Sequence, residues 1–84
     1  MKPIRLLPHA MSRVARRGFT VAQVEETIRT ALWKPAEQGR WECRRRFRYD
    51  RIWNGTQYRY QEVRPIFVDK GDEIVVVTVY TYFF

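Results

Sequence analysis

The stretch Ile74–Phe84, which reads IVVVTVYTYFF, contains no charged residue, no glycine and no proline. Nearly all of its residues are β-branched or aromatic, a composition that favours a β-strand. Side chains alternate between the two faces of a strand. One face is expected to carry Val75, Val77, Val79, Thr81 and Phe83. The other is expected to carry Ile74, Val76, Thr78, Tyr80, Tyr82 and Phe84. Because so apolar a strand would aggregate at an exposed edge, we predict a central strand, with helices over its aliphatic face and a half-open face that bears hydroxyls.

The rest of the chain predicts a single α+β domain over residues 1–84. Residues 1–7 are expected to form an extended arm, because Pro8 keeps Leu7 out of helical geometry. Residues 8–33 are expected to form two helices joined by a short link, and residues 40–84 an antiparallel sheet of three to four strands. We therefore predict an N-terminal helical hairpin packed on one face of that sheet.

Capping preferences bound the two expected helices. Proline suits the first turn of a helix and glycine the position after the last, which places the first helix at about Pro8–Arg17. Thr20 and Gln23 have the spacing of a capping box, so the second helix begins there and runs to about Trp33. Its buried stripe is expected to consist of Val21, Val24, Ile28, Ala31 and Leu32.

From about Trp41 the pattern changes to the period of two that is typical of strands. Asn54-Gly55 predicts a tight hairpin, because both central positions of such a turn need positive φ. Pro65 cannot donate a hydrogen bond to a neighbouring strand, and it predicts a bulge or a break. The segment 69–72, which reads DKGD, is expected to turn the chain into the last strand.

Among the overall properties of the sequence, the net charge indicates most about the partner. The 84 residues carry a net charge of +7 and the pI is near 10.2, which favours an anionic partner such as nucleic acid or an acidic protein. The single cysteine, Cys43, and the single histidine, His9, do not provide a zinc site, so we expect no metal and no cofactor. The longest apolar run is too short for a membrane-spanning helix and no signal peptide is recognisable, so a cytoplasmic protein without a membrane partner is expected.

His9, Arg13 and Arg17 are spaced one turn apart and would line one face of the first helix. Imidazole acts as acid or base near neutral pH, and two guanidiniums hold a phosphate and neutralise charge that develops on it. This set suffices for metal-free RNA cleavage, in which the 2′-hydroxyl attacks the adjacent phosphate. Thr78, Tyr80 and Tyr82 of the last strand could complete the site by donating hydrogen bonds to phosphate. The alternative is that these side chains cap, pack or face solvent.

Arginine supplies half of the residues from Arg40 to Arg51. Arg44, Arg46 and Arg48 would share one strand face at a spacing of about 7 Å, comparable to the phosphate repeat of an extended single strand. With Arg40, Arg51 and the interleaved ring of Trp53, they form a candidate track for a single-stranded nucleic acid. The alternatives are a solvated arginine face that pairs with nearby carboxylates, and a docking surface for an acidic protein.

Three blocks of the chain together resemble the DUF4258 family of small bacterial proteins: His9-Ala10-x-x-Arg13-x-x-x-Arg17-Gly18, Val24–Arg29 and Ile74–Tyr80. That family is similar to RelE-like and BrnT-like toxins. The resemblance therefore implies a RelE/BrnT-like fold and a metal-independent endoribonuclease toxin that cleaves single-stranded or ribosome-bound mRNA. It also implies an acidic antitoxin as partner, and it carries over His9, Arg13, Arg17, Thr78 and Tyr80 as site residues.

Two other functions stay open beside the toxin: a non-catalytic RNA- or DNA-binding module, and an interaction domain for an acidic protein partner. The chain also departs from the family pattern, because it ends in the apolar residues Tyr82-Phe83-Phe84. Such an end could be an interface, either with an antitoxin or with a second copy of the chain in a homodimer.

Overall fold

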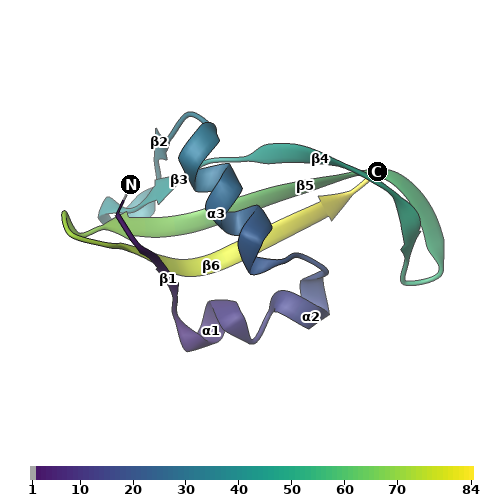
Figure 1. Cartoon of the computed structure of the whole chain (residues 1–84), viewed down its shortest axis with the longest axis horizontal. Coiled ribbons are helices and arrows are strands. Elements are labelled where there is room, and N and C mark those ends of the chain that lie inside the picture. The colour runs from purple at the N-terminus through teal and green to yellow at the C-terminus, as the bar shows by residue number, and fades with distance from the viewer. Residues whose placement is uncertain (1) are drawn as a thin grey trace.

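The computed structural model of the chain describes residues 2–84, which form one mixed β-sheet with α3 (Val21–Thr30) across one of its faces (Figure 1). The helical segments are α1 (Pro8–Met11), α2 (Val14–Arg17), α3 (Val21–Thr30) and the short 3-10 turn η1 (Glu37–Gly39). The strands are β1 (Ile4–Leu6), β2 (Lys34–Pro35), β3 (Trp41–Glu42), β4 (Arg45–Trp53), β5 (Thr56–Asp69) and β6 (Ile74–Phe83). Their order is β1-β6-β5-β3-β2, and β4 pairs with a further stretch of β5. The predicted α+β class is confirmed.

The hydrophobic core lies between α3 and the sheet (Figure 1). Val24 and Ile28 of α3 are fully or almost fully buried. They belong to one cluster with apolar side chains of the two longest central strands: Val63, Phe67, Ile74, Val76 and Val79. The start of β6 lies between β1 and β5, so the prediction that this apolar strand is central is confirmed there.

The N-terminal segment is part of the sheet, whereas the sequence predicted an extended arm. β1 pairs parallel to the start of β6, where Ile4 lies opposite Ile74. An ion pair between Arg5 and Glu73 joins the same segment to the chain just before β6. The sheet therefore has six strands and is mixed, and the prediction of three to four antiparallel strands was wrong. Strands of two or three residues, such as β1, β2 and β3, are too short to show a pattern in the sequence.

The first predicted helix, Pro8–Arg17, is broken into α1 and α2 at Ser12 and Arg13. The Ser12 hydroxyl donates to the His9 carbonyl at 2.7 Å, a local bond of the kind that competes with regular helix. The Arg13 N–H bonds three residues back at 3.1 Å, one short of the α-helical partner. The sequence predicted that His9 and Arg17 lie on one continuous helical face. Because of this break they do not.

The second predicted helix is confirmed at its start and is shorter at its end. Thr20 and Gln23 form the complete capping box. The helix stops at Thr30, so Leu32, which was expected in the buried stripe, is 90% exposed. The Trp33 indole donates to the carbonyl of Ile28 at 2.8 Å and so satisfies one group of the last turn from outside the helix. Within residues 2–84, no helix is long and apolar enough to cross a membrane.

β6 does not keep the strict alternation that its sequence predicts. Thr78 pairs with Ile66 and Val76 pairs with Phe67, which leaves Val77 as an extra residue in β6. Such a β-bulge moves every later side chain to the opposite face. The helix-covered face therefore holds buried residues from both sides of the bulge: Ile74, Val76 and Val79.

The hairpin between β4 and β5 forms as predicted. Asn54 and Gly55 have φ of +49° and +81°, the values that a two-residue turn of this kind requires. Trp53 closes the turn opposite Thr56. The ring of Trp53 stacks on that of Phe83, with centroids 5.1 Å apart, and so fixes the hairpin to the end of β6.

Candidate functional site

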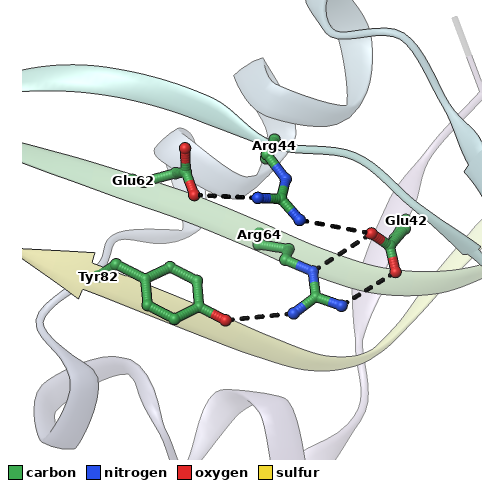
Figure 2. Close-up of polar contacts among 5 residues, drawn as sticks. All are labelled: Glu42, Arg44, Glu62, Arg64 and Tyr82. Atoms are coloured by element: carbon green, nitrogen blue, oxygen red, sulfur yellow. Dashed lines mark hydrogen bonds and ion pairs between the residues drawn. The ribbon is translucent and has the colours of Figure 1, made fainter.

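The candidate site is the face of the sheet opposite α3, here called the open face. α3 packs against Val63 and Val79, so the residues that alternate with these point away from it. The open face carries Glu42, Arg44, Arg46, Arg48, Tyr60, Glu62, Arg64, Thr78, Tyr80 and Tyr82. Figure 2 shows five of these side chains, which meet across the neighbouring strands. Arginine and tyrosine dominate the set. Thr78, Tyr80 and Tyr82 bear the hydroxyls that the sequence predicted on a half-open face of β6.

A network of charges crosses the middle of this face (Figure 2). Arg64 donates to both carboxylate oxygens of Glu42, at 3.3 and 3.0 Å, and to the Tyr82 hydroxyl at 3.2 Å. Arg44 lies between two carboxylates, 3.8 Å from Glu42 and 3.5 Å from Glu62. The hydrogen bonds from Arg64 lower the pKa of Glu42, and the same bonds raise the pKa of Arg64. Both arginines are therefore held by carboxylates, which offset part of their charge.

Arg46 and Arg48 of β4 contact aromatic rings. The Arg46 guanidinium carbon lies 4.8 Å from the ring centroid of Phe84 and 5.8 Å from that of Tyr60. That of Arg48 lies 5.9 Å from the Tyr60 centroid, and Arg48 is also paired with Asp50. Arg46 is exposed and makes no ion pair within residues 2–84. It therefore keeps a free positive charge beside two rings.

A hollow of about 560 Å³, here called the large hollow, opens on this face beside η1. It is lined by Pro35, Ala36, Glu37, Gln38, Arg40, Glu42, Arg64, Ile66, Thr78 and Tyr80. Three residues that the sequence assigned to two different groups, Arg40, Thr78 and Tyr80, thus come together. Register explains this, because β3 and β6 pair with the same stretch of β5.

Tyr80 is contacted by guanidiniums from two elements. The Arg17 guanidinium carbon of α2 lies 5.2 Å from the ring centroid, and that of Arg64 on β5 lies 5.3 Å from it. Arg17 is fixed in place, because it donates to the Val79 carbonyl at 2.7 Å and its own carbonyl accepts from the Thr81 hydroxyl at 2.6 Å. Two predicted catalytic residues, Arg17 and Tyr80, are therefore in contact.

His9 and Arg13 lie apart from that pair. His9 is exposed on α1, and its imidazole makes no hydrogen bond within residues 2–84. Arg13 is half-buried at the break between α1 and α2, where its Nε is buried without a hydrogen-bond partner among the described residues. Neither side chain lines the large hollow. Among residues 2–84, no side-chain hydrogen bond, ion pair or ring contact joins His9 or Arg13 to Arg17 or Tyr80 in one site.

Trp53 and Arg51 lie at the turn end of the hairpin. The Trp53 ring packs on Phe83 and lies close to Gly18. A Cβ added to Gly18 would lie 2.8 Å from the Trp53 ring. The Arg51 guanidinium carbon lies 4.3 Å from the ring centroid of Tyr49. The pairing of β4 with β5 shifts register between Arg48 and Arg51. A smaller hollow of about 230 Å³ at this end is lined by Arg16, Arg17, Trp53, Tyr80, Thr81 and Phe83.

Arg64 belongs to the open face, although the sequence did not single it out as a site residue. Arg64 stands in the run TQYRYQEVRPIF, which contains no recognisable motif. The one available signal is its spacing of two from Glu62, which places both on the same face of a strand. Its contacts with Glu42 and Tyr82 depend on strand register, which the sequence does not reveal.

Cys43 lies away from this face. Its thiol is buried and lies 3.6 Å from the Thr27 carbonyl of α3, and burial raises its pKa to about 12. The thiol is therefore protonated at neutral pH. Because the thiolate is the form that attacks as a nucleophile and binds metals, neither reaction is favoured. Within residues 2–84, no three His, Cys, Asp or Glu side chains are grouped so that they could hold a metal ion.

The chemistry of the open face is therefore that of guanidiniums, phenols and carboxylates. Guanidiniums can bind anions and flat rings, and phenols can donate hydrogen bonds. The resemblance to DUF4258 stays a hypothesis beside this geometry. Comparison of the chain with protein-family models, with curated proteins and with solved structures found no match.

Proposed function

We propose that the protein binds single-stranded RNA along the open face of its sheet. The observation that carries the proposal is the row Arg44, Arg46 and Arg48, which runs beside the rings of Tyr60 and Phe84. Extended single strands are bound by cations that contact the phosphates and by rings on which the bases stack. The open face offers both along one pair of strands.

The charge of the chain supports an anionic ligand. The net charge is +7, and of the 16 cationic residues only Lys2, Lys34 and Lys70 are lysines. Arginine holds phosphate through two parallel hydrogen bonds and also stacks on rings, which lysine does not. Because carboxylates already hold Arg44 and Arg48, Arg46, which makes no ion pair with the rest of residues 2–84, is expected to contribute most to binding.

A salt-dependent binding assay tests this proposal. Fluorescence anisotropy of a labelled single-stranded RNA of mixed sequence would give the Kd of the wild type and of Arg46→Ala. We expect this variant to bind about tenfold more weakly, because it loses a phosphate contact and the support of two rings, worth about 1–3 kcal/mol. The slope of log Kd against log salt concentration should fall by about 0.7.

Arg29→Ala is the matched control for that assay. Arg29 lies on α3, where it pairs with Glu25 at 3.2 Å, so the variant removes the same charge on the helix side of the sheet. It should bind RNA as the wild type does, apart from a small uniform loss. Equal losses in the two arginine variants, or binding that does not respond to salt, would contradict the proposal.

A second candidate function is cleavage of the bound RNA without a metal, by a toxin of RelE/BrnT-like fold. The contact of Arg17 and Arg64 with the Tyr80 ring favours it. Two guanidiniums can hold the scissile phosphate and stabilise the charge that develops on it, and a phenol can donate a proton or a hydrogen bond. In this mechanism His9 is the acid or base, and it would have to approach Tyr80 when RNA binds.

Incubation of the purified protein with RNA in excess EDTA separates the two functions. Cleavage that is lost in Arg17→Ala and Tyr80→Phe but kept in Arg29→Ala would establish the nuclease. Additional loss in His9→Ala would place His9 in the mechanism, and unchanged cleavage would remove it. RNA that is bound and recovered intact would favour the binding module.

The end of β6 is the proposed surface for an acidic antitoxin. Tyr82 and Phe84 are 42% and 47% exposed there, next to the positive charge of Arg46. A second copy of the chain is the alternative occupant, in a homodimer. Light scattering of the protein alone distinguishes them, because only the homodimer would form without an added acidic partner.

A further inference from the structure

The large hollow lies outside the arginine row that is proposed to bind RNA, and that proposal does not explain its size or its lining. Its volume of about 560 Å³ is within the range of small-molecule sites, about 300–1,000 Å³. One wall is the segment 35–38, which leads from β2 into η1, and Thr78 and Tyr80 of β6 line it as well. It is therefore a concave part of the open face, whereas the row Arg44, Arg46 and Arg48 is an exposed surface.

Two features of its lining distinguish this hollow. Arg40 is half-buried, yet its guanidinium makes no hydrogen bond or ion pair with any residue of 2–84. Gln38 has φ of +60°, the left-handed conformation that residues other than glycine rarely adopt and that is often found at functional sites. The hollow is thus lined by a cation without a hydrogen-bond or ion-pair partner among residues 2–84 and by a residue whose backbone is left-handed.

We infer that the large hollow is a binding site for one nucleotide, with the phosphate at Arg40 and the base between Gln38 and Tyr80. The inference rests on the proposed function in one respect, namely that the bound RNA strand supplies this nucleotide. A base has a flat apolar surface that suits Ile66 and the Tyr80 ring. Its polar edge can bond the Gln38 amide and the hydroxyl of Thr78.

The charges in the hollow favour a nucleotide over a simple anion. Glu42 is occupied by Arg64, so this pair presents little net charge to a ligand. Glu37 is exposed and also lines the hollow, where it would repel a highly charged ion. Of the two arginines that line the hollow, only Arg40 has no hydrogen-bond or ion-pair partner among residues 2–84, so it can attract one phosphate. The remaining lining offers hydrogen bonds and apolar surface. Inorganic phosphate alone would leave most of this lining unused.

Nuclear magnetic resonance titration of the isotope-labelled protein tests the inference with free ligands. The probes are the four nucleoside monophosphates, added separately, and inorganic phosphate. We expect at least one monophosphate to shift the signals of Gln38, Arg40 and Thr78, with an affinity about tenfold higher than that of phosphate, since base contacts add to the phosphate contact. No shift in these residues, or equal affinity for phosphate, would overturn the inference.

Variants assign the contacts. Arg40→Ala should weaken monophosphate binding about tenfold or more, because it removes a charged hydrogen-bond donor. Thr78→Val keeps the shape of the side chain and should weaken binding about threefold by removal of one neutral hydrogen bond. Arg29→Ala, which acts on the other side of the sheet, should leave it unchanged. Full binding by Arg40→Ala with retained native spectra would refute the phosphate position.

The same spectra recorded with single-stranded RNA separate this inference from the proposed function. Shifts along Arg46 and Tyr60 together with the large hollow would support both. RNA shifts along β4 that leave the hollow unchanged would overturn the inference and keep the proposed function. Monophosphate shifts in the hollow without RNA binding would keep the nucleotide site and overturn RNA as its source.

Discussion

Replacement of Gly18 by alanine should destabilise the fold by more than its backbone conformation explains. Gly18 has φ of +71°, and a Cβ there would lie 2.8 Å from two ring atoms of Trp53. A left-handed residue other than glycine costs about 1–2 kcal/mol, and overpacking adds about 1–3 kcal/mol. The Trp53 ring is stacked on Phe83, so it cannot move away without loss of that contact. The free energy of unfolding should fall by about 2–5 kcal/mol in total.

Gly39 provides the matched control, because its φ is also +71° and nothing lies within 4 Å of a Cβ built there. Gly39→Ala should therefore show the backbone cost alone. Thermal unfolding followed by circular dichroism would measure both variants. In a domain of this size 1 kcal/mol corresponds to about 4–8 °C, so Gly18→Ala should lower the Tm by at least about 4 °C more than Gly39→Ala.

A double variant identifies the obstacle. Trp53→Leu removes the ring that meets the new methyl group, so Gly18→Ala and Trp53→Leu together should cost at least about 1 kcal/mol less than the sum of the single changes. Equal Tm values for Gly18→Ala and Gly39→Ala would refute the steric reasoning. Strict additivity of the double variant would show that Trp53 is not the residue responsible.

The ion pair, the thiol and the end of α3 each give another test. Glu42→Gln should cost about 1–2 kcal/mol at neutral pH. Arg64 lowers the pKa of Glu42 in the folded state, so the stability difference between the wild type and Glu42→Gln should be complete above the unfolded-state pKa of Glu42. It should disappear as the pH falls through the lower folded-state pKa. Urea unfolding at a series of pH values would measure this. Cys43, whose pKa burial raises to about 12, should react with a thiol reagent slowly in the native protein and rapidly in urea. Leu32→Ser should change the free energy of unfolding by less than about 0.5 kcal/mol, whereas Ile28→Ala should cost about 2–5 kcal/mol in the same urea assay.

The features that the sequence predicts well are those determined by neighbouring residues. The capping box of Thr20 and Gln23 and the turn at Asn54-Gly55 need only local backbone geometry, and both are present. The alternation after Trp41 holds as far as Arg48, because Arg45 points to the helix side and pairs with Glu26 while its neighbours lie on the open face. A register shift in the pairing with β5 interrupts it between Arg48 and Arg51.

Features that depend on distant residues could not be predicted in this way. β1 is a strand only because β6 provides its hydrogen-bond partners, and its three residues show no pattern of their own. The early end of α3 depends on Trp33, whose indole bonds the Ile28 carbonyl while its ring packs on Phe67 of β5. In each case a long-range contact overrides the local preference.

In the candidate site, too, residue types could be recognised in the sequence but contacts between distant residues could not. Arg17, Thr78 and Tyr80 could be selected by residue type, and the structure brings Arg17 and Tyr80 into contact. The equally close contact of Arg64 with Tyr80 depends on the register between β5 and β6, where the two residues are paired. His9 could be selected for its chemistry, but the break at Ser12 separates its helix from α2.

The β-bulge at Val77 is what makes an open, polar face compatible with an apolar β6. Without it, strict alternation would place Ile74 and Val76 on the same face as Tyr80. Either these aliphatic side chains would be exposed or the tyrosine would be buried under α3 without a partner for its hydroxyl, at a cost of about 1–3 kcal/mol. The extra residue lets Ile74, Val76 and Val79 share the core while Tyr80 stays 40% exposed between two guanidiniums. The bulge therefore separates the face that stabilises the fold from the face proposed to bind RNA.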